Sequence, residues 1–123
     1  MKKGKKSSGG RYKKSRKKKL YELGRQTRVV KLGEKKTKVI RGRGGDKKIV
    51  SLSQKEVNVM VKGKAKKTLI KTVVETPSNR FLARQNILVK GAIIETGLGR
   101  ARITNRPSQE GIVQAEILAE EKQ

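Results

Sequence analysis

The sequence predicts an all-β fold: a small closed or partly open β-barrel of about six to eight short strands, with a basic N-terminal tail that is disordered when free. Three observations support this. Val, Ile and Thr dominate short segments in which apolar and polar residues alternate. Gly and polar turns separate these segments. The first 20 residues carry 11 basic side chains and no acidic one. Many short, closely spaced strands favour a barrel or sandwich, and closure hides the sheet edges.

The tail is predicted to span residues 1–24, and the barrel domain residues 25–123. Repulsion between like charges and the lack of apolar residues prevent a packed core in the tail. Gly4, Gly9 and Gly10 add backbone freedom, which lets the tail follow an irregular phosphate surface. Residues 16–23 are compatible with one turn of helix that ends at Gly24.

Eight strands are predicted from the alternation of side chains. Val57, Val59 and Val61 share one face of one such segment, and Ala101 and Ile103 share one face of another, which is the pattern of half-buried strands. The predicted strands lie near residues 28–32, 37–41, 48–53, 56–62, 68–76, 91–95, 100–105 and 112–118.

Tight turns and loops are predicted between the strands. Gly-containing turns lie at residues 43–46, 62–64 and 96–99, and a longer loop lies at residues 106–111. Residues 77–85 break the β pattern, because Pro77 is followed by residues typical of about one helical turn.

Charge narrows the range of partners. The chain has 123 residues, so one domain is expected. Its 34 basic and 10 acidic residues give a net charge of +24, which attracts nucleic acid, an anionic membrane or an acidic protein. The longest apolar runs hold three or four residues, whereas a membrane-spanning helix needs about 20. No apolar segment of a signal peptide follows the basic start. Nucleic acid is therefore the expected partner, and a membrane is not.

The absence of Cys and His from the sequence argues against an enzyme. It excludes disulfides and removes the usual general base and the commonest metal ligand. Glu75, Glu95 and Glu110 are interpreted as solvated or ion-paired acids rather than as a catalytic or metal site. The GxG at residues 97–99 lacks the third Gly and the helix of a dinucleotide site, so it is interpreted as a turn. Neither a cofactor nor a small-molecule substrate is expected.

Aromatic residues are few: Tyr12, Tyr21 and Phe81. Proteins that stack successive bases of a single strand need a row of aromatic faces. We therefore expect this chain to recognise nucleic acid by its backbone, shape and fit.

Basic groups outside the tail each allow two interpretations. Residues 41–45 form either an exposed turn or a phosphate grip of Arg forks and Gly amides, and these interpretations are compatible. Arg100, Arg102 and Arg106 form either the solvent face of a strand or a basic stripe, and the stripe is favoured. Arg80 and Arg84 lie in a segment that is either a binding loop or an ordinary polar loop.

Several motifs resemble one family nearly from end to end. They are Ser-Gly-Gly-Arg at residues 8–11, the basic run 16–19, Tyr-Glu-Leu-Gly-Arg at 21–25, the Arg-Gly-Arg-Gly-Gly-Asp segment within 38–48, and the segments 73–79, 90–96 and 98–107. The chain resembles the archaeal and eukaryotic "e" type of small-subunit ribosomal protein eight. It lacks the insertion of the longer eukaryotic members, which indicates an archaeal source. It departs from the family at Ser8, commonly Thr, and in lacking a His in the first basic stretch.

The resemblance implies a structural protein of the cytoplasmic ribosome that takes part in translation. It implies small-subunit ribosomal RNA and neighbouring ribosomal proteins as partners, with the barrel seated on the RNA and the tail inserted between RNA helices. Tyr21 and Leu23 are expected to anchor the tail to the barrel. The residues predicted to bind RNA are Lys2, Lys3, Lys5, Lys6, Gly9, Gly10, Arg11, Lys13, Lys14, Arg16, Lys17, Lys18, Lys19, Arg25, Arg41, Arg43, Lys47, Lys48, Arg80, Arg84, Arg100, Arg102 and Arg106.

Three alternatives remain open on the residues alone. A free nucleic-acid chaperone or DNA-compacting protein shares the charge but stays outside ribosomes. An RNA-modifying domain conflicts with the missing His, Cys and cofactor motif. A barrel module of a translation factor does not account for the basic tail.

Overall fold

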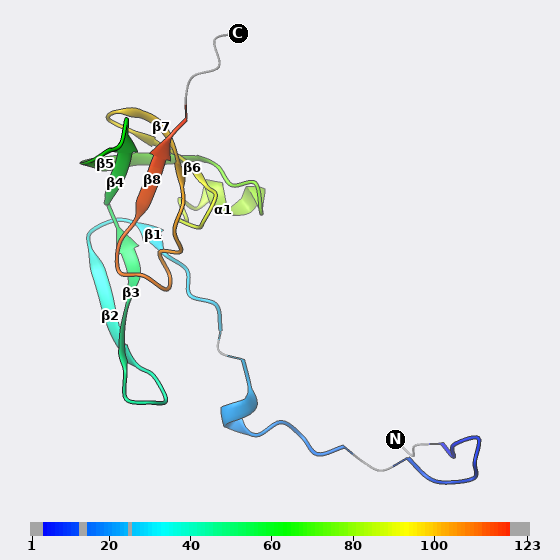
Figure 1. The fold of residues 1–123 in the computed structure, drawn as a ribbon. Helices are drawn as coiled ribbons and strands as arrows, with labels where there is room; N and C mark the ends of the chain where they lie inside the picture. The colour runs from blue at the N-terminus through cyan, green and yellow to red at the C-terminus, as the bar shows by residue number, and fades with distance from the viewer. Residues whose placement is uncertain (1–3, 13–14, 25, 119–123) are drawn as a thin grey trace.

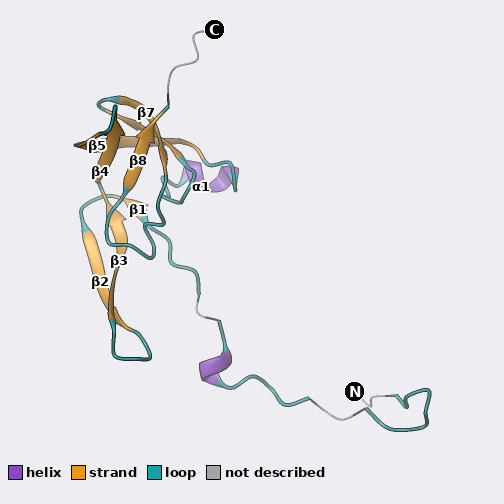
Figure 2. Cartoon of the chain, viewed as in Figure 1, coloured by secondary structure: helices purple, strands orange, loops and turns teal. Residues whose placement is uncertain are grey.

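The computed structural model describes residues 4–12, 15–24 and 26–118 and confirms the predicted fold class. Within these residues the chain is nearly all β (Figure 2). A strand occurs in each of the eight predicted places, and short helical turns occur in both predicted places. The elements are η1 Leu20–Glu22, β1 Lys31–Leu32, β2 Lys36–Arg41, β3 Lys47–Gln54, β4 Glu56–Val61, β5 Lys64–Glu75, α1 Arg80–Arg84, β6 Ile93–Thr96, β7 Gly99–Ile103 and β8 Gln114–Ile117.

Five strands close the barrel in the order β4-β5-β6-β7-β8. Strands β4 and β8 are parallel neighbours, and the other neighbouring pairs are antiparallel. The predicted alternation produces the core. Val57 and Val59 of β4 point inwards and are fully buried, whereas Met60, on the outer face of the same strand, is half exposed. Ala101 and Ile103 of β7 are likewise buried. The resulting core is aliphatic.

Strands β1, β2 and β3 form a separate sheet in the order β1-β3-β2. The barrel therefore uses five strands, fewer than the six to eight expected. The reason is that most side chains of β2 and of the first half of β3 are exposed. Val39 and Ile49 lie opposite each other in register and are more than half exposed, so they take no part in the barrel core. The β2–β3 hairpin instead projects away from the barrel (Figure 1).

The predicted strand at 28–32 is shorter in the structure. Only Lys31 and Leu32 pair with β3, in parallel. Val30 is nevertheless buried, and its carbonyl accepts a hydrogen bond from the Leu88 amide at 2.8 Å. Beyond its two paired residues, this segment is therefore held by extended contacts with the loop after α1 rather than by a longer regular strand.

The turn between β4 and β5 has the geometry that its sequence predicts. Lys62 has φ +47° and Gly63 has φ +78°, so both residues of this two-residue turn have a left-handed backbone conformation. Such turns match the twist of the strands that they join, and Gly is favoured where φ is positive. No atom lies within 4 Å of the position that a Cβ at residue 63 would occupy, so steric crowding does not explain the Gly. Its positive φ does.

We expect Gly63→Ala to lower the free energy of unfolding by about 1–2 kcal/mol, because a left-handed backbone is unfavourable for a residue with a Cβ. Gly97→Ala is the matched control, since Gly97 also has open space around it but lacks a positive φ. Chemical denaturation of both variants measures the difference. Equal destabilisation by the two substitutions would show that the turn conformation is not the cause.

Candidate nucleic-acid interface

Each predicted RNA-binding residue that the structure describes is exposed. In the tail these are Lys5, Lys6, Gly9, Gly10, Arg11, Arg16, Lys17, Lys18 and Lys19, and in the body they are Arg41, Arg43, Lys47, Lys48, Arg80, Arg84, Arg100, Arg102 and Arg106. Lys2, Lys3, Lys13, Lys14 and Arg25 lie outside the described residues. The expected disorder of the free tail stays a prediction.

The Ser-Gly-Gly motif makes a local turn in the tail. The amide of Lys6 donates to the carbonyl of Gly10 at 2.7 Å, and the amide of Gly9 donates to the carbonyl of Lys6 at 3.0 Å. Lys5 and Arg11 form an isolated antiparallel bridge that closes this loop. Gly9 has φ +80°, which explains why Gly stands there. The turn directs Lys5 and Arg11 into solvent from adjacent positions.

A second turn of the tail is held by an ion pair. The Arg16 guanidinium donates to both carboxylate oxygens of Glu22, at 2.7 and 2.6 Å. The Lys19 amide donates to the same carboxylate at 2.9 Å and so caps η1. Arg16 is therefore already paired with an acid in the free chain, whereas Lys17, Lys18 and Lys19 keep exposed side chains.

We expect the pKa of the Glu22 carboxyl to lie below its ordinary value, because the Arg16 guanidinium and the Lys19 amide favour its ionised form. A lowered pKa means that the ion pair is present above the ordinary carboxyl pKa and is lost as pH falls through the lowered value. A carbon-detected NMR titration of the Glu carboxyls measures this. Arg16→Gln should move the midpoint back towards the ordinary value, and an unchanged midpoint would contradict the pairing.

The β2–β3 turn contacts the tail directly. The Arg43 Nη2 donates to the backbone carbonyl of Tyr21 at 2.9 Å. The turn itself is tight, because the Gly42 amide donates to the Asp46 carbonyl at 2.7 Å and Gly45 has φ +92°. The turn interpretation of residues 41–45 is thus confirmed, and the contact joins the hairpin tip to η1, which directly follows the basic run 16–19.

The expectation that Tyr21 and Leu23 anchor the tail to the barrel is wrong. The Tyr21 side chain is 61% exposed and that of Leu23 is 53% exposed. The structure joins the tail to the body through the Tyr21 carbonyl and the Arg43 side chain instead. A backbone acceptor has no signal in the sequence, which is why the resemblance pointed to the side chains of Tyr21 and Leu23 instead.

Basic side chains occupy both faces of the hairpin. Arg41 and Lys47 lie opposite each other on one face, and Lys48 lies on the other face opposite Ile40. Lys38, two residues before Ile40, shares the face of Lys48. Lys36 and Lys38 are exposed basic residues of β2 that the sequence interpretation left unassigned. Their position on the projecting hairpin identifies them as candidates.

The basic stripe on β7 is less positive than its sequence suggests. Arg100 and Arg102 do point outwards, opposite the buried Ala101. However, the register places Glu95 of β6 beside Arg100 and Glu116 of β8 beside Arg102. Arg106 lies in the following loop. The acidic neighbours weaken the field of the stripe, so it is a weaker candidate for phosphate contact than the hairpin.

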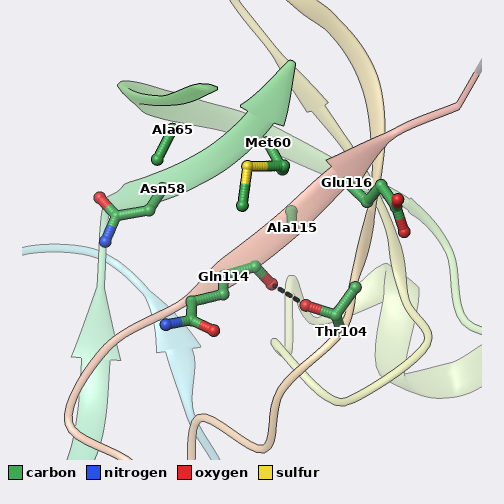
Figure 3. Close-up of a pocket in the computed structure, with 7 residues that line it drawn as sticks. All are labelled: Asn58, Met60, Ala65, Thr104, Gln114, Ala115 and Glu116. Atoms are coloured by element: carbon green, nitrogen blue, oxygen red, sulfur yellow. Dashed lines mark hydrogen bonds between the residues drawn. The ribbon is translucent and has the colours of Figure 1, made fainter. Parts of the chain in front are cut away.

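The barrel surface also carries a shallow hollow of about 340 Å³ between β4 and β8 (Figure 3). Its lining is mostly amide, hydroxyl and apolar groups, including Met60, Gln114 and Thr104, whose hydroxyl donates to the Gln114 carbonyl at 3.4 Å. Its one charged lining residue is Glu116, which disfavours an anion. In the described residues no cluster of three or more His, Cys, Asp or Glu side chains could hold a metal, and no helix is long and apolar enough to cross a membrane.

Comparison with known proteins gives a consistent result. The family model described as ribosomal protein S8e matches residues 1–118. The small ribosomal subunit protein eS8 of Nanoarchaeum equitans (strain Kin4-M) is 45% identical over 106 residues, which cover 85% of this chain and 84% of the relative. The protein of the same description from Methanocella arvoryzae (strain DSM 22066 / NBRC 105507 / MRE50) is 40% identical over 116 residues, which cover 93% of each chain.

Proposed function

Since this chain belongs to the ribosomal protein S8e family, we propose that it binds and stabilises small-subunit ribosomal RNA through its tail and the β2–β3 hairpin. Family membership makes it a structural constituent of the small subunit of the cytoplasmic ribosome, with a part in translation, rather than an enzyme. The archaeal relatives agree with the archaeal source that the short form of the sequence indicates.

The contact between Arg43 and the Tyr21 carbonyl carries this proposal, because it unites two basic segments that lie far apart in the sequence. Exposed Lys17, Lys18 and Lys19 and the exposed cations of the hairpin tip are then available to the same RNA. Phosphate contacts of this kind fix position and register without reading bases. Binding neutralises phosphates of neighbouring RNA segments, so that these segments can approach each other more closely.

Both faces of the projecting hairpin support insertion between RNA segments. Exposed cations stand on each face, and the paired strands hold them at fixed spacing. The tail adds cations on a backbone with fewer fixed contacts. We infer that the hairpin sets orientation while the tail follows the RNA surface and orders on binding. Neighbouring ribosomal proteins are proposed to cover parts of the remaining surface.

Sedimentation tests the proposal at the level of the particle. In a cell lysate run through sucrose gradients at moderate and high salt, we expect the protein to track the small subunit and to survive the higher salt. A protein that stays at the top of the gradient, or leaves as soon as salt rises, would instead be a free nucleic-acid binder held by charge alone.

The salt dependence of binding to small-subunit RNA tests whether the hairpin tip belongs to the RNA-binding surface. Arg43→Ala should weaken binding and reduce the slope of log K against log[salt] by about 1, as expected for one lost phosphate contact. Lys67→Ala is the control, because the Lys67 ammonium already pairs with Glu56 at 2.7 Å on the barrel. If both variants gave the same slope of log K against log[salt], the hairpin tip would not be part of the RNA-binding surface.

A further inference from the structure

Phe81 is the sole aromatic residue of the barrel domain and the most exposed of the chain's three aromatic residues. Its side chain is 67% exposed on the short helix α1, although Phe is among the residues most often buried. Exposed Arg80 and Arg84 stand on the same short helix, one residue before and three residues after it. Neither Arg makes an ion pair with a described residue. An exposed aromatic ring and two guanidinium groups without an ion-pair partner among the described residues therefore share one short helix.

The helix that carries Phe81 is held firmly. The Asn79 side chain caps it by accepting a hydrogen bond from the Phe81 amide at 3.0 Å. At its other end, the side-chain oxygen of Asn86 accepts from the Val73 amide of β5 at 3.1 Å. Ala83, on the inner side, packs against the barrel core. These contacts fix the backbone under Phe81, so its exposure is set by the fold rather than by a loose loop.

A groove of about 530 Å³ runs beside this helix against β5. Arg80 and Arg84 line it, together with Val74, which is 44% exposed. Glu75 is the one acidic residue in this lining. Phe81 itself is not part of this lining, so the groove contributes the two cations and the exposed ring of Phe81 lies outside it on the same helix.

The position of α1 connects this patch to the proposed RNA surface. The loop after α1 pairs with the segment that follows the tail, since the Leu88 amide donates to the Val30 carbonyl at 2.8 Å and the Leu32 amide donates to the Asn86 carbonyl at 3.0 Å. Lys31 and Ile87 form a bridge between the same segments. RNA that follows the tail into the body therefore arrives beside α1.

We propose that Phe81 stacks an unpaired base of the RNA, while Arg80 and Arg84 hold phosphates of the nucleotides next to that base. The inference rests on the proposed function and adds a base contact to a protein otherwise expected to recognise backbone and shape. Recognition of unpaired RNA bases commonly combines an aromatic face with cationic groups. One aromatic residue provides one stacking position, so the contact favours a bulged or looped nucleotide over a long single strand. The two arginines favour RNA over an apolar protein partner.

The test uses the full chain and two RNA probes of about 12 nucleotides, at roughly 0.3 M salt to screen the tail. One probe is single-stranded oligoadenylate, and the other is a ribose-phosphate strand of equal length without bases. We expect Phe81→Ala to weaken binding of oligoadenylate roughly 5- to 140-fold, the range for one base stacked on an aromatic side chain. Binding of the base-free strand should change less than about twofold, because stacking needs a base.

Further variants separate stacking from simple apolar contact. Phe81→Trp should retain affinity, and its fluorescence should be quenched by oligoadenylate but not by the base-free strand. Phe81→Leu should lose affinity as Phe81→Ala does, since Leu is apolar but has no ring. The matched control is Leu69→Ala, which removes a half-exposed apolar side chain from β5 and should leave binding unchanged.

Three results would overturn the stacking inference: equal losses on both probes, full affinity of Phe81→Leu, or no loss for Phe81→Ala. If the chain still sediments with the small subunit in any of these cases, stacking fails alone and the proposed function stands. If wild type binds neither probe nor small-subunit RNA, both fail together.

Discussion

Neutralising the 11 basic residues of the first 20 is expected to cause the largest loss of RNA affinity of any change in this chain. Each lost phosphate contact reduces the slope of log K against log[salt] by about 0.7–0.9. If between about five and 11 of these side chains contact phosphate, the slope falls by roughly 3.5–10. At 0.2 M salt we expect affinity for small-subunit RNA to fall by on the order of a hundredfold or more.

The variant replaces these cations with Ser and Gln in the full chain, so that the barrel and the chain length are unchanged. Filter binding over a range of salt gives the affinity and the slope together. A second variant keeps the composition of the tail but shuffles its order, which destroys the Ser-Gly-Gly turn around Gly9 while it preserves charge. If charge dominates, the shuffled tail keeps the slope. A neutral tail with an unchanged slope would disprove its role in phosphate binding.

Much of the fold is predictable from the sequence because strands have a period of two. The alternation of Val57, Val59 and Val61 fixes one face of β4 without any long-range information, and the Lys62-Gly63 turn fixes where the chain reverses. The same signal does not say which strands close a barrel. Val39 and Ile49 resemble core residues in sequence, and only the pairing of β2 with β3 outside the barrel explains their exposure.

The sequence predicts which residues of the candidate site are exposed cations, but it predicts less well how they are arranged in space. Local runs of Lys and Arg identify exposed cations, because such side chains are rarely buried without partners. The contact of Arg43 with the Tyr21 carbonyl joins residues 22 positions apart through a backbone atom, and no side-chain pattern encodes it. Arg16 illustrates the reverse case, since a neighbouring Glu22 neutralises it in the folded tail. The exposure of Phe81 likewise depends on which side of α1 meets β5, which its five residues do not reveal.

The second large expected effect concerns stability. Leu88→Ala should lower the free energy of unfolding by about 2–5 kcal/mol, because the Leu88 side chain is 1% exposed and its removal leaves a cavity in the core. Leu88 also lies where the loop after α1 meets the segment that follows the tail, because its backbone amide donates a hydrogen bond to the Val30 carbonyl. Domains of this size are typically stable by roughly 5–15 kcal/mol, so the loss is a large share of the total.

Leu69→Ala is the matched control for this prediction, since it removes the same side-chain atoms from a position that is 54% exposed and should cost no more than about 0.5 kcal/mol. Urea unfolding followed by circular dichroism measures both variants. Similar midpoints would show that Leu88 is not part of a packed core. Where Leu88→Ala remains folded, its salt slope for RNA should equal that of the wild type, because no cation has been removed. Stability and RNA affinity are therefore separable in this chain: the barrel core holds the cationic surface in place, and the tail and hairpin supply its charge.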